Sequence, residues 1–503
     1  MNNFIIKEIY KDISEGLEYK KIKFRFSPEP NGVLHIGHVK AIYINFELAK
    51  HFNSKINLRF DDTNPKNENI FFVKHIINNI RWLGYRWDKI TFASDYFLIL
   101  YKFAKKLIIN KKAYIEYINK NKSNYIYDVD KVLYYFKNMK LGKYNENEYI
   151  LRANLKYDLP NYHLKDPIMY RIIKYKHYKT GYKWSIYPTY DWAHGQCDYI
   201  ENITHSLCSI EFQNHKKLYD WYISNIYNKT INKYKPKQIE FSRLNIKDTI
   251  TSKRQLNFLI EKKIIKNYGD PRLSTLISLK NKGYKNFQIL DFINKIGFTK
   301  RNTQIKIDYL NTYIKPQIIQ SCPILMVIFN PLKIIITNFK DKYFKWIYIN
   351  NYRIKFTKYI YIEYNDFKLN HDNNFFRLSL KNYVRLKYAY IIKSYKITKI
   401  KERISKVYCK IYKNINNKKI KSTIQWVNCI FLEKIKIINY KYIYIKNKKI
   451  YNKNSLYIQK GYIDKNCLNN LKIKTLYQFL RIGFFYYFKK KNFVKFLFFK
   501  KQY

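Results

Sequence analysis

The chain has 503 residues, too many for a single hydrophobic core, so about two to four domains are expected. Lysine and arginine number 97 against 36 aspartates and glutamates, and the formal charge of +61 indicates a polyanionic partner. The chain is also rich in Lys, Asn, Ile and Tyr, which A/T-rich codons encode, so codon drift is an alternative source of the excess charge.

Membrane insertion and disulfide bonding are both disfavoured. No run of about 18 apolar residues is present, and the start MNNFIIKEIYKD lacks the long apolar core of a secretion signal. The six cysteines are scattered and form no CxxC or Cys/His zinc spacing. We therefore expect a reduced, cytoplasmic protein that does not bind membranes and has no dedicated metal-binding residues.

A strand, a Pro/Gly turn and a helix are predicted in succession near the N-terminus. Ile22–Phe26 is apolar and strand-like, RFSPEPNGVLHIGHVK follows from residue 25 to residue 40, and residues 41–49 have helical character. The first turn of a helix that follows a strand attracts phosphate through its free N–H groups and its dipole. His35 and His38 share one helix face, and Gly37 leaves room for a ligand ring.

This stretch resembles the HIGH signature of class I aminoacyl-tRNA synthetases, and the preceding PEPNG resembles their glutamyl/glutaminyl branch. The resemblance implies a Rossmann-type α/β catalytic domain that uses ATP, with His35 and His38 as catalytic residues. It also implies ATP contacts from a larger set in this stretch: Glu29, Pro30, Asn31, His35, Ile36, Gly37, His38, Val39, Lys40 and Ala41.

An acidic turn follows the next predicted strand, Lys55–Phe60. Ligands of open parallel sheets lie at the carboxyl ends of strands, so Asp61 is positioned to hold an ammonium group. The alternative is an Asp-Asn-Pro turn with local hydrogen bonds. RFDDTNP matches the family motif, and the resemblance implies that Arg25 and Asp61 bind the amino acid. A helix is predicted over Phe71–Trp82.

From about residue 97 to residue 183 the catalytic fold is interrupted, where the family has its domain for the tRNA acceptor stem. LKDPIMYRI, residues 164–172, matches that domain well. Between about residues 117 and 131 the chain looks shorter than its relatives. The missing part includes a loop that helps to open the terminal base pair in relatives, so this opening is either absent here or done by fewer residues.

The catalytic fold resumes with IYPTYDWAH, residues 186–194, and THSLCSIEFQ, residues 204–213. The two together resemble glutaminyl enzymes more than glutamyl ones, which usually carry an Arg-containing stretch in place of SLC. The resemblance implies an ATP contact from Ser209. Asn214 replaces an aspartate that contacts the acceptor stem, which is expected to loosen base discrimination. Glutamine contacts are implied for Tyr190, His194 and Gln238.

Residues 240–245, EFSRLN, are predicted as the last strand of this fold. Ile250-Thr251-Ser252-Lys253-Arg254 resembles the second class I signature, KMSKS, with Thr251 in place of its methionine. A basic surface loop is the alternative. The resemblance implies that Lys253 is catalytic and that ATP is contacted by Arg243, Leu244, Thr251, Ser252 and Lys253.

Beyond the helical run that ends near Tyr313, the apolar pattern changes to period two, for example over Lys358–Tyr364 and Tyr383–Tyr390, which predicts β-barrels. The family has two anticodon-binding barrels here, and Ile324 replaces an anticodon-contacting arginine. The C-terminal tract at 484–500 is either a strand and tail or a contact with RNA or membrane. The resemblance implies four anticodon contacts, since Arg and Gln side chains can stack on unpaired bases and hydrogen-bond to their edges, although an ordinary surface side chain explains each residue nearly as well: Arg377, Arg385, Gln478 and Arg481.

The resemblance implies a monomer that joins glutamine to tRNA(Gln) with ATP and Mg²⁺, the Mg²⁺ arriving with ATP. A glutamyl or non-discriminating synthetase and a non-catalytic tRNA-binding relic are the alternatives. Five domains are predicted, namely two catalytic halves, an acceptor-stem insertion, a helical connecting subdomain and the anticodon-binding barrels. The first catalytic half spans residues 1–96 and the insertion spans residues 97–183. The second catalytic half spans residues 184–254, the helical subdomain spans residues 255–322 and the barrels span residues 323–503.

Overall fold

The chain forms two compact units. The first comprises Met1–Tyr268, Ser274–Ile277 and Asn286–Tyr309, and the second comprises Gly269–Leu273, Ser278–Lys285 and Leu310–Tyr503, so the middle of the chain crosses repeatedly between them. The computed structural model describes residues 3–119, 122–155, 161, 164–228, 234–247, 249–250, 252–301, 303–349, 352–369, 375–380, 382–413, 420, 422–444 and 451–495.

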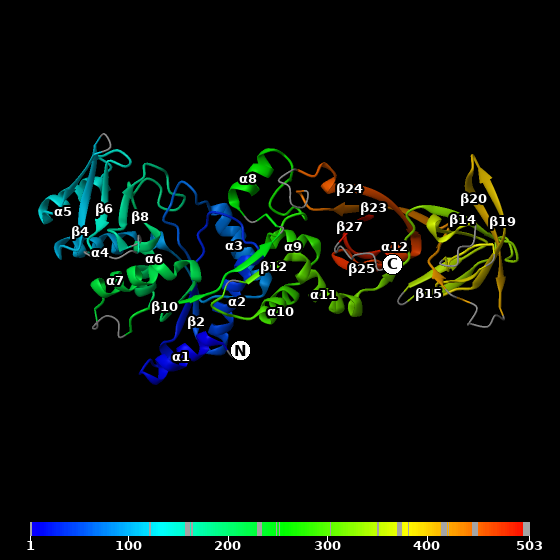
Figure 1. Cartoon of the computed structure of the whole chain (residues 1–503), viewed down its shortest axis with the longest axis horizontal. Coiled ribbons are helices and arrows are strands. Elements are labelled where there is room, and N and C mark those ends of the chain that lie inside the picture. The colour runs from blue at the N-terminus through cyan, green and yellow to red at the C-terminus, as the bar shows by residue number, and fades with distance from the viewer. Residues whose placement is uncertain are drawn as a thin grey trace. The chain divides into compact units, whose positions relative to one another are not determined.

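Parallel strands form the centre of the first unit (Figure 1). β1 (Lys23–Phe26), β2 (Lys55–Phe60) and β3 (Lys89–Phe92) pair in that order, and β9 (His205–Ser209) pairs with β10 (Lys237–Phe241). Thr204 N donates to Lys23 O at 3.1 Å, which places the start of β9 beside β1. The helices of this part are α1 (Phe4–Ser14), α2 (Ile36–His51), α3 (Ile70–Leu83), α6 (Tyr190–Ile200) and α7 (Lys216–Ile226). The strands predicted at Ile22–Phe26 and Lys55–Phe60 and the helix predicted over Phe71–Trp82 are confirmed.

The two motif histidines themselves begin helix α2. Nδ1 of His35 accepts a hydrogen bond from Gly37 N at 3.1 Å, and Nδ1 of His38 accepts one from His35 N at 3.1 Å. This reciprocal arrangement satisfies N–H groups that the first turn of a helix leaves without partners. The motif therefore fixes both the start of the helix and the orientation of both rings.

The inserted segment folds as an antiparallel sheet. Its strand order is β5-β4-β6-β7-β8, and the part that looks shorter than relatives is the β4–β5 hairpin, paired from Ile115↔Ile126 to Asn119↔Lys122. Apolar side chains of α4 and α5 pack with this sheet in one buried cluster. The elements are α4 (Phe97–Ile109), β4 (Ala113–Asn119), β5 (Lys122–Ile126), α5 (Val129–Lys140), β6 (Tyr149–Ala153), β7 (Ile168–Ile172) and β8 (Ile186–Pro188).

The continuous strand predicted over residues 240–245 is wrong. β10 ends at Phe241, and β11 (Leu244–Lys247) begins a different pairing with β12 (Thr303–Lys306). Ser242 turns the chain, because its N–H donates to Thr299 O at 2.9 Å and its hydroxyl accepts from Lys40 Nζ at 2.7 Å. Backbone and side-chain hydrogen bonds at one residue therefore interrupt an otherwise strand-like run.

Helices follow the strand break, in the region predicted to be a helical subdomain. They are α8 (Lys253–Glu261), α9 (Leu276–Lys282), α10 (Asn286–Ile296) and α11 (Ile307–Ser321). Short 3₁₀ turns elsewhere in the described chain include η1 (Tyr19–Lys21), η2 (Ala93–Tyr96), η4 (Ile210–His215), η5 (Tyr364–Asp366) and η7 (Lys453–Ser455). The five domain boundaries taken from the sequence stay predictions.

The second unit is built on two β-sheets with one buried apolar cluster running through both. The first sheet has the order β21-β18-β19-β20-β14-β17-β22, the second has the order β13-β25-β26-β27-β23-β24, and β15 and β16 form a hairpin. The elements are β13 (Ile324–Leu325), β14 (Pro331–Ile336), β15 (Lys345–Ile349), β16 (Tyr352–Phe356), β17 (Tyr359–Glu363), β18 (Tyr383–Leu386), β19 (Ile391–Ile400), β20 (Arg403–Tyr412), β21 (Thr423–Ile424), β22 (Val427–Asn428), β23 (Leu432–Tyr440), β24 (Leu456–Asp464), α12 (Lys465–Asn469), β25 (Thr475–Phe479), β26 (Gly483–Lys489) and β27 (Asn492–Lys495).

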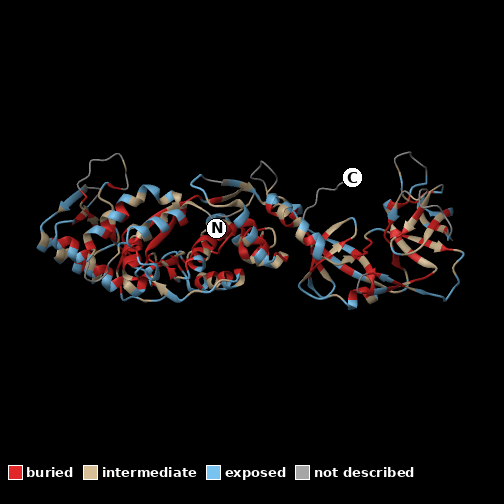
Figure 2. Ribbon diagram, turned by 90° about the horizontal axis from the view of Figure 1, so that it is seen from below, coloured by how far each residue is buried: buried red, intermediate tan, exposed pale blue. Residues whose placement is uncertain are grey.

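The two period-two runs become strands, one of them shorter than expected. The first forms β17, but the second stops at Leu386, because Ala389 N closes a turn on Leu386 O at 2.9 Å with Tyr388 at a φ of 61°. Figure 2 shows buried residues on the inner faces of helices and strands and exposed ones outside. No helix among the described residues is long and apolar enough to cross a membrane. Residues 496–500 of the aromatic C-terminal tract lie outside the described chain.

Trp426 is the largest side chain buried in the second unit, and Trp426→Ala is expected to destabilise that unit by about 3–5 kcal/mol. The ring packs edge-on against Phe356 at 5.0 Å, and its Nε1 donates to Lys387 O at 2.9 Å, so truncation leaves a cavity and an unpaired carbonyl. Urea denaturation followed by circular dichroism measures the loss. Trp346→Ala, at a half-buried site under Arg353, is the matched control and should lose about 1 kcal/mol or less. Equal losses would contradict the assignment of Trp426 to the core.

Candidate active site

A cavity of about 490 Å³ opens in the first unit where β1, β9 and β10 end and α2 begins. Its lining comes from residues 25–45, residues 190–212 and residues 241–268. The carboxyl ends of parallel strands are where α/β folds bind ligands. The sequence-predicted motifs therefore meet at one place, although they are far apart along the chain.

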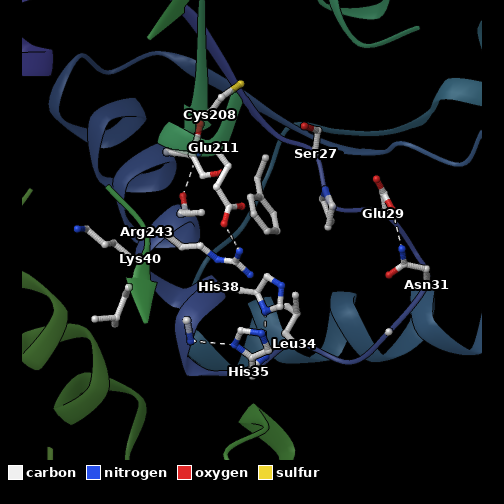
Figure 3. A pocket seen from close by; sticks show the side chains of 18 of the residues that line it. Ser27, Glu29, Asn31, Leu34, His35, His38, Lys40, Cys208, Glu211 and Arg243 are labelled. Carbon is white, nitrogen blue, oxygen red and sulfur yellow. Dashed lines mark hydrogen bonds and ion pairs between the residues drawn. The ribbon is translucent and has the colours of Figure 1, made fainter. Parts of the chain in front are cut away.

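His35 and His38 lie side by side at this cavity, with ring centroids 3.9 Å apart (Figure 3). Because each Nδ1 accepts a backbone N–H, the ring proton of each histidine resides on Nε2. Burial, with the charges of His38 and Arg243, lowers the pKa of His35 to about 2, and burial and Arg243 lower the pKa of His38 to about 4. Both rings are therefore neutral hydrogen-bond donors at neutral pH.

Two cations and a carboxylate complete this side of the cavity. Arg243 Nη1 lies 2.6 Å from Glu211 Oε1, as Figure 3 shows, and Lys253 Nζ donates to Asn67 O at 3.2 Å. Burial lowers the pKa of Lys253, while the nearby Glu68 and Glu29 carboxylates oppose that shift. Lys253 is held by a neutral carbonyl, so its charge is available to an anionic ligand.

Two arginines and two aspartates form a buried network behind the cavity. Asp198 Oδ1 accepts from Arg25 Nε at 3.0 Å and from Arg59 Nη1 at 2.8 Å, and Asp61 Oδ1 accepts from Arg59 Nε at 2.8 Å. Burial would favour protonated Asp198, but the Arg25 and Arg59 charges hold the pKa of Asp198 far below its usual range. Arg59 also faces the buried carboxylate of Glu201 at 3.9 Å, so each arginine has carboxylate partners that allow the group to be buried.

His194 connects this network to the cavity. Its Nε2 lies 2.7 Å from Arg25 Nη2, and its Nδ1 lies 3.1 Å from Asp61 Oδ2. An arginine only donates, so Nε2 accepts and the proton on Nδ1 goes to Asp61. The Tyr190 ring stacks on His194 at 4.8 Å and 28°. The position of Tyr190 thus depends on the charge network beneath it.

A second cavity of about 10 Å³ adjoins the first and shares Tyr190, His194, Cys208 and Phe212 with it. Gln238 lines this smaller space, and its Nε2 donates to Phe212 O at 3.2 Å and to Glu240 Oε1 at 3.0 Å. Tyr190 is half-buried at the cavity, and desolvation raises the pKa of its phenol and keeps the hydroxyl protonated. Polar side chains of Tyr190 and Gln238 therefore line this smaller space, together with the paired Asp191 and His215.

The structure places most, but not all, of the predicted site residues at the main cavity. Pro30, Ile36, Val39 and Ser252 are absent from its lining, Ile36 and Val39 being fully buried core residues, and Thr251 lies outside the described residues. Asp61 is also absent from the lining, since its oxygens bond to Arg59 and His194. The predicted residues that line it are Arg25, Glu29, Asn31, His35, Gly37, His38, Lys40, Ala41, Tyr190, His194, Ser209, Arg243, Leu244 and Lys253.

The four predicted anticodon residues belong to the second unit, and none of them is in the lining of this cavity. Arg377 and Arg481 meet at the carboxylate of Asp366. Gln478 lies in β25, paired in register with Ile324 of β13, and Arg385 lies in β18. Their roles stay predictions.

Sequence reasoning missed two residues of the site. Asp198 follows His194 by four positions on α6, and helical spacing alone would have placed both on one face. Glu211 forms an ion pair with Arg243, and no local sequence pattern predicts this pair. Within the described ranges, no three His, Cys, Asp or Glu side chains come together as metal ligands.

Three family descriptions match consecutive parts of the chain. The catalytic domain of class I tRNA synthetases (E and Q) matches residues 21–319, and two anticodon-binding domains of the same class match residues 322–412 and 423–487.

Curated relatives match along nearly the whole chain. A glutamine–tRNA ligase of Buchnera aphidicola subsp. Schizaphis graminum is 39% identical over 539 residues, covering 96% of this chain and 95% of the relative. One from Buchnera aphidicola subsp. Baizongia pistaciae is 38% identical over 519 residues, covering 95% and 94%. One from Clostridium kluyveri is 35% identical over 525 residues, covering 96% and 93%.

Lys40 is 1% exposed beside the cavity and donates to Ser242, and burial lowers its pKa to about 8. A lysine whose folded pKa lies below its unfolded value of 10.5 destabilises the fold below pH 8, and stability recovers as pH rises from about 8 to 10.5. The wild type should therefore gain about 2–3 kcal/mol relative to Lys40→Met across that window. Urea denaturation at pH 7.5 and pH 10 measures this difference.

Lys50→Met is the matched control, because Lys50 is exposed on the same helix and should show no comparable pH dependence. A constant difference between wild type and Lys40→Met at both pH values would refute the buried-cation interpretation.

Proposed function

Because the chain belongs to the class I tRNA synthetases (E and Q), we propose that it activates glutamine with ATP and transfers it to tRNA(Gln). One observation carries the proposal: a single cavity brings neutral His35 and His38, with Arg243 and Lys253, to the same space as Tyr190. The first four suit a nucleotide phosphate, and Tyr190 suits a polar side chain. The named relatives support the choice of glutamine.

The first step proposed is in-line attack by a carboxylate oxygen of glutamine on the α-phosphorus of ATP. The bond from that phosphorus to its bridging oxygen breaks, and pyrophosphate leaves. Negative charge spreads over phosphate oxygens, and preorganised donors stabilise such charge best. The Nε2–H groups of His35 and His38 and the ammonium of Lys253 are the donors we assign to it.

The second step proposed is attack by a terminal ribose hydroxyl of the tRNA on the acyl carbon, with release of AMP. Neither step requires an enzyme nucleophile. The described residues offer no three-residue metal-ligand cluster, so we assign no step to a protein-bound Mg²⁺; an ion would enter on the phosphates of ATP.

Selection of glutamine over glutamate is proposed to arise from the arrangement around Arg25. Its donors are directed to Asp198, the Leu207 carbonyl, Ser206 and His194. The positive charge of Arg25 is already balanced, and a glutamate carboxylate would add an unbalanced buried charge. A neutral amide avoids that penalty.

Two other readings are less well supported. A glutamyl enzyme needs a cation for the substrate carboxylate, and Arg25, which lines the same cavity as Tyr190, already donates to Asp198 and Ser206. A non-catalytic relic would not need His35, His38 and Lys253 to line one cavity. A monomeric state and a cytoplasmic location stay predictions, and light scattering checks the first.

Lys253→Ala should lower kcat for adenylate formation about 10²–10³-fold with little change in KM for ATP, the effect of losing one preorganised donor. The ammonium lies at the cavity and contacts only a neutral carbonyl and the Phe72 ring in the described structure. Quenched-flow kinetics of ATP consumption measures kcat. Arg254→Ala is the control, since the neighbouring arginine is exposed and does not line the cavity. A near-normal kcat for Lys253→Ala would reject the role.

The wild type should prefer glutamine to glutamate by about 10⁴–10⁵-fold in kcat/KM, because buried polar groups lose their partners when the wrong side chain binds. Tyr190→Phe should reduce use of glutamine far more than use of ATP, since only the hydroxyl is removed. Aminoacylation with saturating tRNA measures both. Tyr182→Phe, at a position 77% exposed, is the control for this substitution. Comparable kcat/KM values for the two amino acids in the wild type would move the proposal to the glutamyl alternative.

A further inference from the structure

A buried carboxylate in the second unit joins two arginines that are far apart in the sequence. Asp366 is 1% exposed and lies in the turn η5 that follows β17. Its Oδ1 lies 3.1 Å from Arg377 Nη1, and its Oδ2 accepts from Arg481 Nη2. Arg377 precedes β18 of the seven-stranded sheet, whereas Arg481 lies in the β25–β26 turn of the six-stranded sheet. One carboxylate therefore sets the relative position of side chains from both sheets.

The two arginine side chains stay partly exposed to solvent although their guanidinium groups are paired with Asp366. The Arg377 and Arg481 side chains are 41% and 32% exposed, compared with 2% for Asp366. Each guanidinium has five N–H groups, and the carboxylate occupies only part of that set. The remaining donors are presented in a fixed plane, as edge recognition and stacking of unpaired bases require.

An ion pair that served only to stabilise the fold would not need two arginines on one carboxylate. One arginine suffices to neutralise a buried carboxylate, and no second carboxylate forms an ion pair with either guanidinium among the described residues. Glu363, three residues earlier, accepts from the backbone N–H groups of Phe329 and Asn330 at 2.9 Å each, and its charge also acts on Arg481. The two guanidinium groups share the Asp366 carboxylate and so keep N–H donors for an anionic partner.

The same turn attracts a third arginine. The guanidinium of Arg403 lies over the Tyr364 ring at 4.8 Å, and its Nη2 donates to Asn330 Oδ1 at 3.0 Å. Tyr364 and Asp366 are the two ends of η5. A three-residue turn therefore gathers three guanidinium groups, which is typical of a surface that contacts nucleic acid.

We propose that Asp366 is a positioning residue for anticodon recognition, which holds Arg377 and Arg481 in one fixed geometry against the unpaired bases of the tRNA. This rests on the proposed function, because it takes tRNA(Gln) as the partner. Asp366 itself does not touch the RNA. It removes the freedom of two long side chains before binding, and such preorganisation increases affinity and selectivity.

The test compares cognate transcript with transcripts in which each anticodon base is replaced in turn. Asp366→Asn keeps the shape of the side chain and removes its charge. The ratio of cognate to non-cognate kcat/KM should fall about 10- to 100-fold, the range of one lost base contact. Asp464→Asn is the matched control, because Asp464 is a buried carboxylate of the same unit that caps α12 through backbone N–H groups alone. Its ratio should not change.

Coupling separates a positioning role from a general loss of stability. Arg377→Gln/Arg481→Gln should lose the same discrimination, and adding Asp366→Asn to that double variant should cause little further loss. Additive losses, or an unchanged ratio in Asp366→Asn with a native circular dichroism spectrum, would overturn the proposal. Should Asp366→Asn not fold, the double arginine variant decides: retained discrimination there also overturns it. A wild type that attaches no glutamine to tRNA would refute the proposed function, not the role of Asp366. In that case the role of Asp366 is still tested by filter binding, which measures the affinity of each variant for the same transcripts.

Discussion

The first unit depends on one buried carboxylate placed between two arginines. Asp198 of α6 accepts from Arg25 of β1 and from Arg59 of β2, and so joins a helix to two neighbouring strands by charge. Removal of one partner from a buried ion pair costs about 3–5 kcal/mol, because an uncompensated charge remains. His194, bonded to Arg25 and Asp61, transmits this constraint to the Tyr190 ring. The buried ion pairs of Asp198 thus help to fix the positions of the side chains that line the substrate cavity.

The two sides of the cavity manage charge in opposite ways. On the amino-acid side, full charges are buried and balanced, and the surface offered to a ligand is polar but neutral. On the nucleotide side, His35 and His38 are neutral because burial opposes their protonation, and their use as caps of α2 fixes the tautomer. Rigid neutral donors beside a partly exposed Lys253 suit an anion whose charge changes during reaction.

Local pattern predicted the elements that local forces determine. The strand–turn–helix over Ile22–Ala49 and the strand ending at Phe60 emerged because apolar periodicity and Pro/Gly chemistry act over short range. The strand predicted across Ser242 was wrong, because the bonds at its break involve Lys40 and Thr299, which lie 202 and 57 residues away along the chain. Asp61 matched its motif, yet its oxygens bond to protein groups that no spacing reveals. Asp366 was invisible for the same reason, as Arg481 lies 115 residues beyond it.

The crossing of the chain between units has a consequence for synthesis on the ribosome. Gly269–Leu273 belongs to the second unit, and Arg272 Nη1 donates at 2.9 Å to Ser455 Oγ, 183 residues later. At translation speeds of about 5–20 residues per second, that partner emerges roughly 10–40 s after the arginine. In the folded structure Arg272 also has a local partner, since Asp270 accepts from its Nε and Nη2 at 2.9 and 2.8 Å. This short-range ion pair needs no later part of the chain, so it can form before Ser455 has been made.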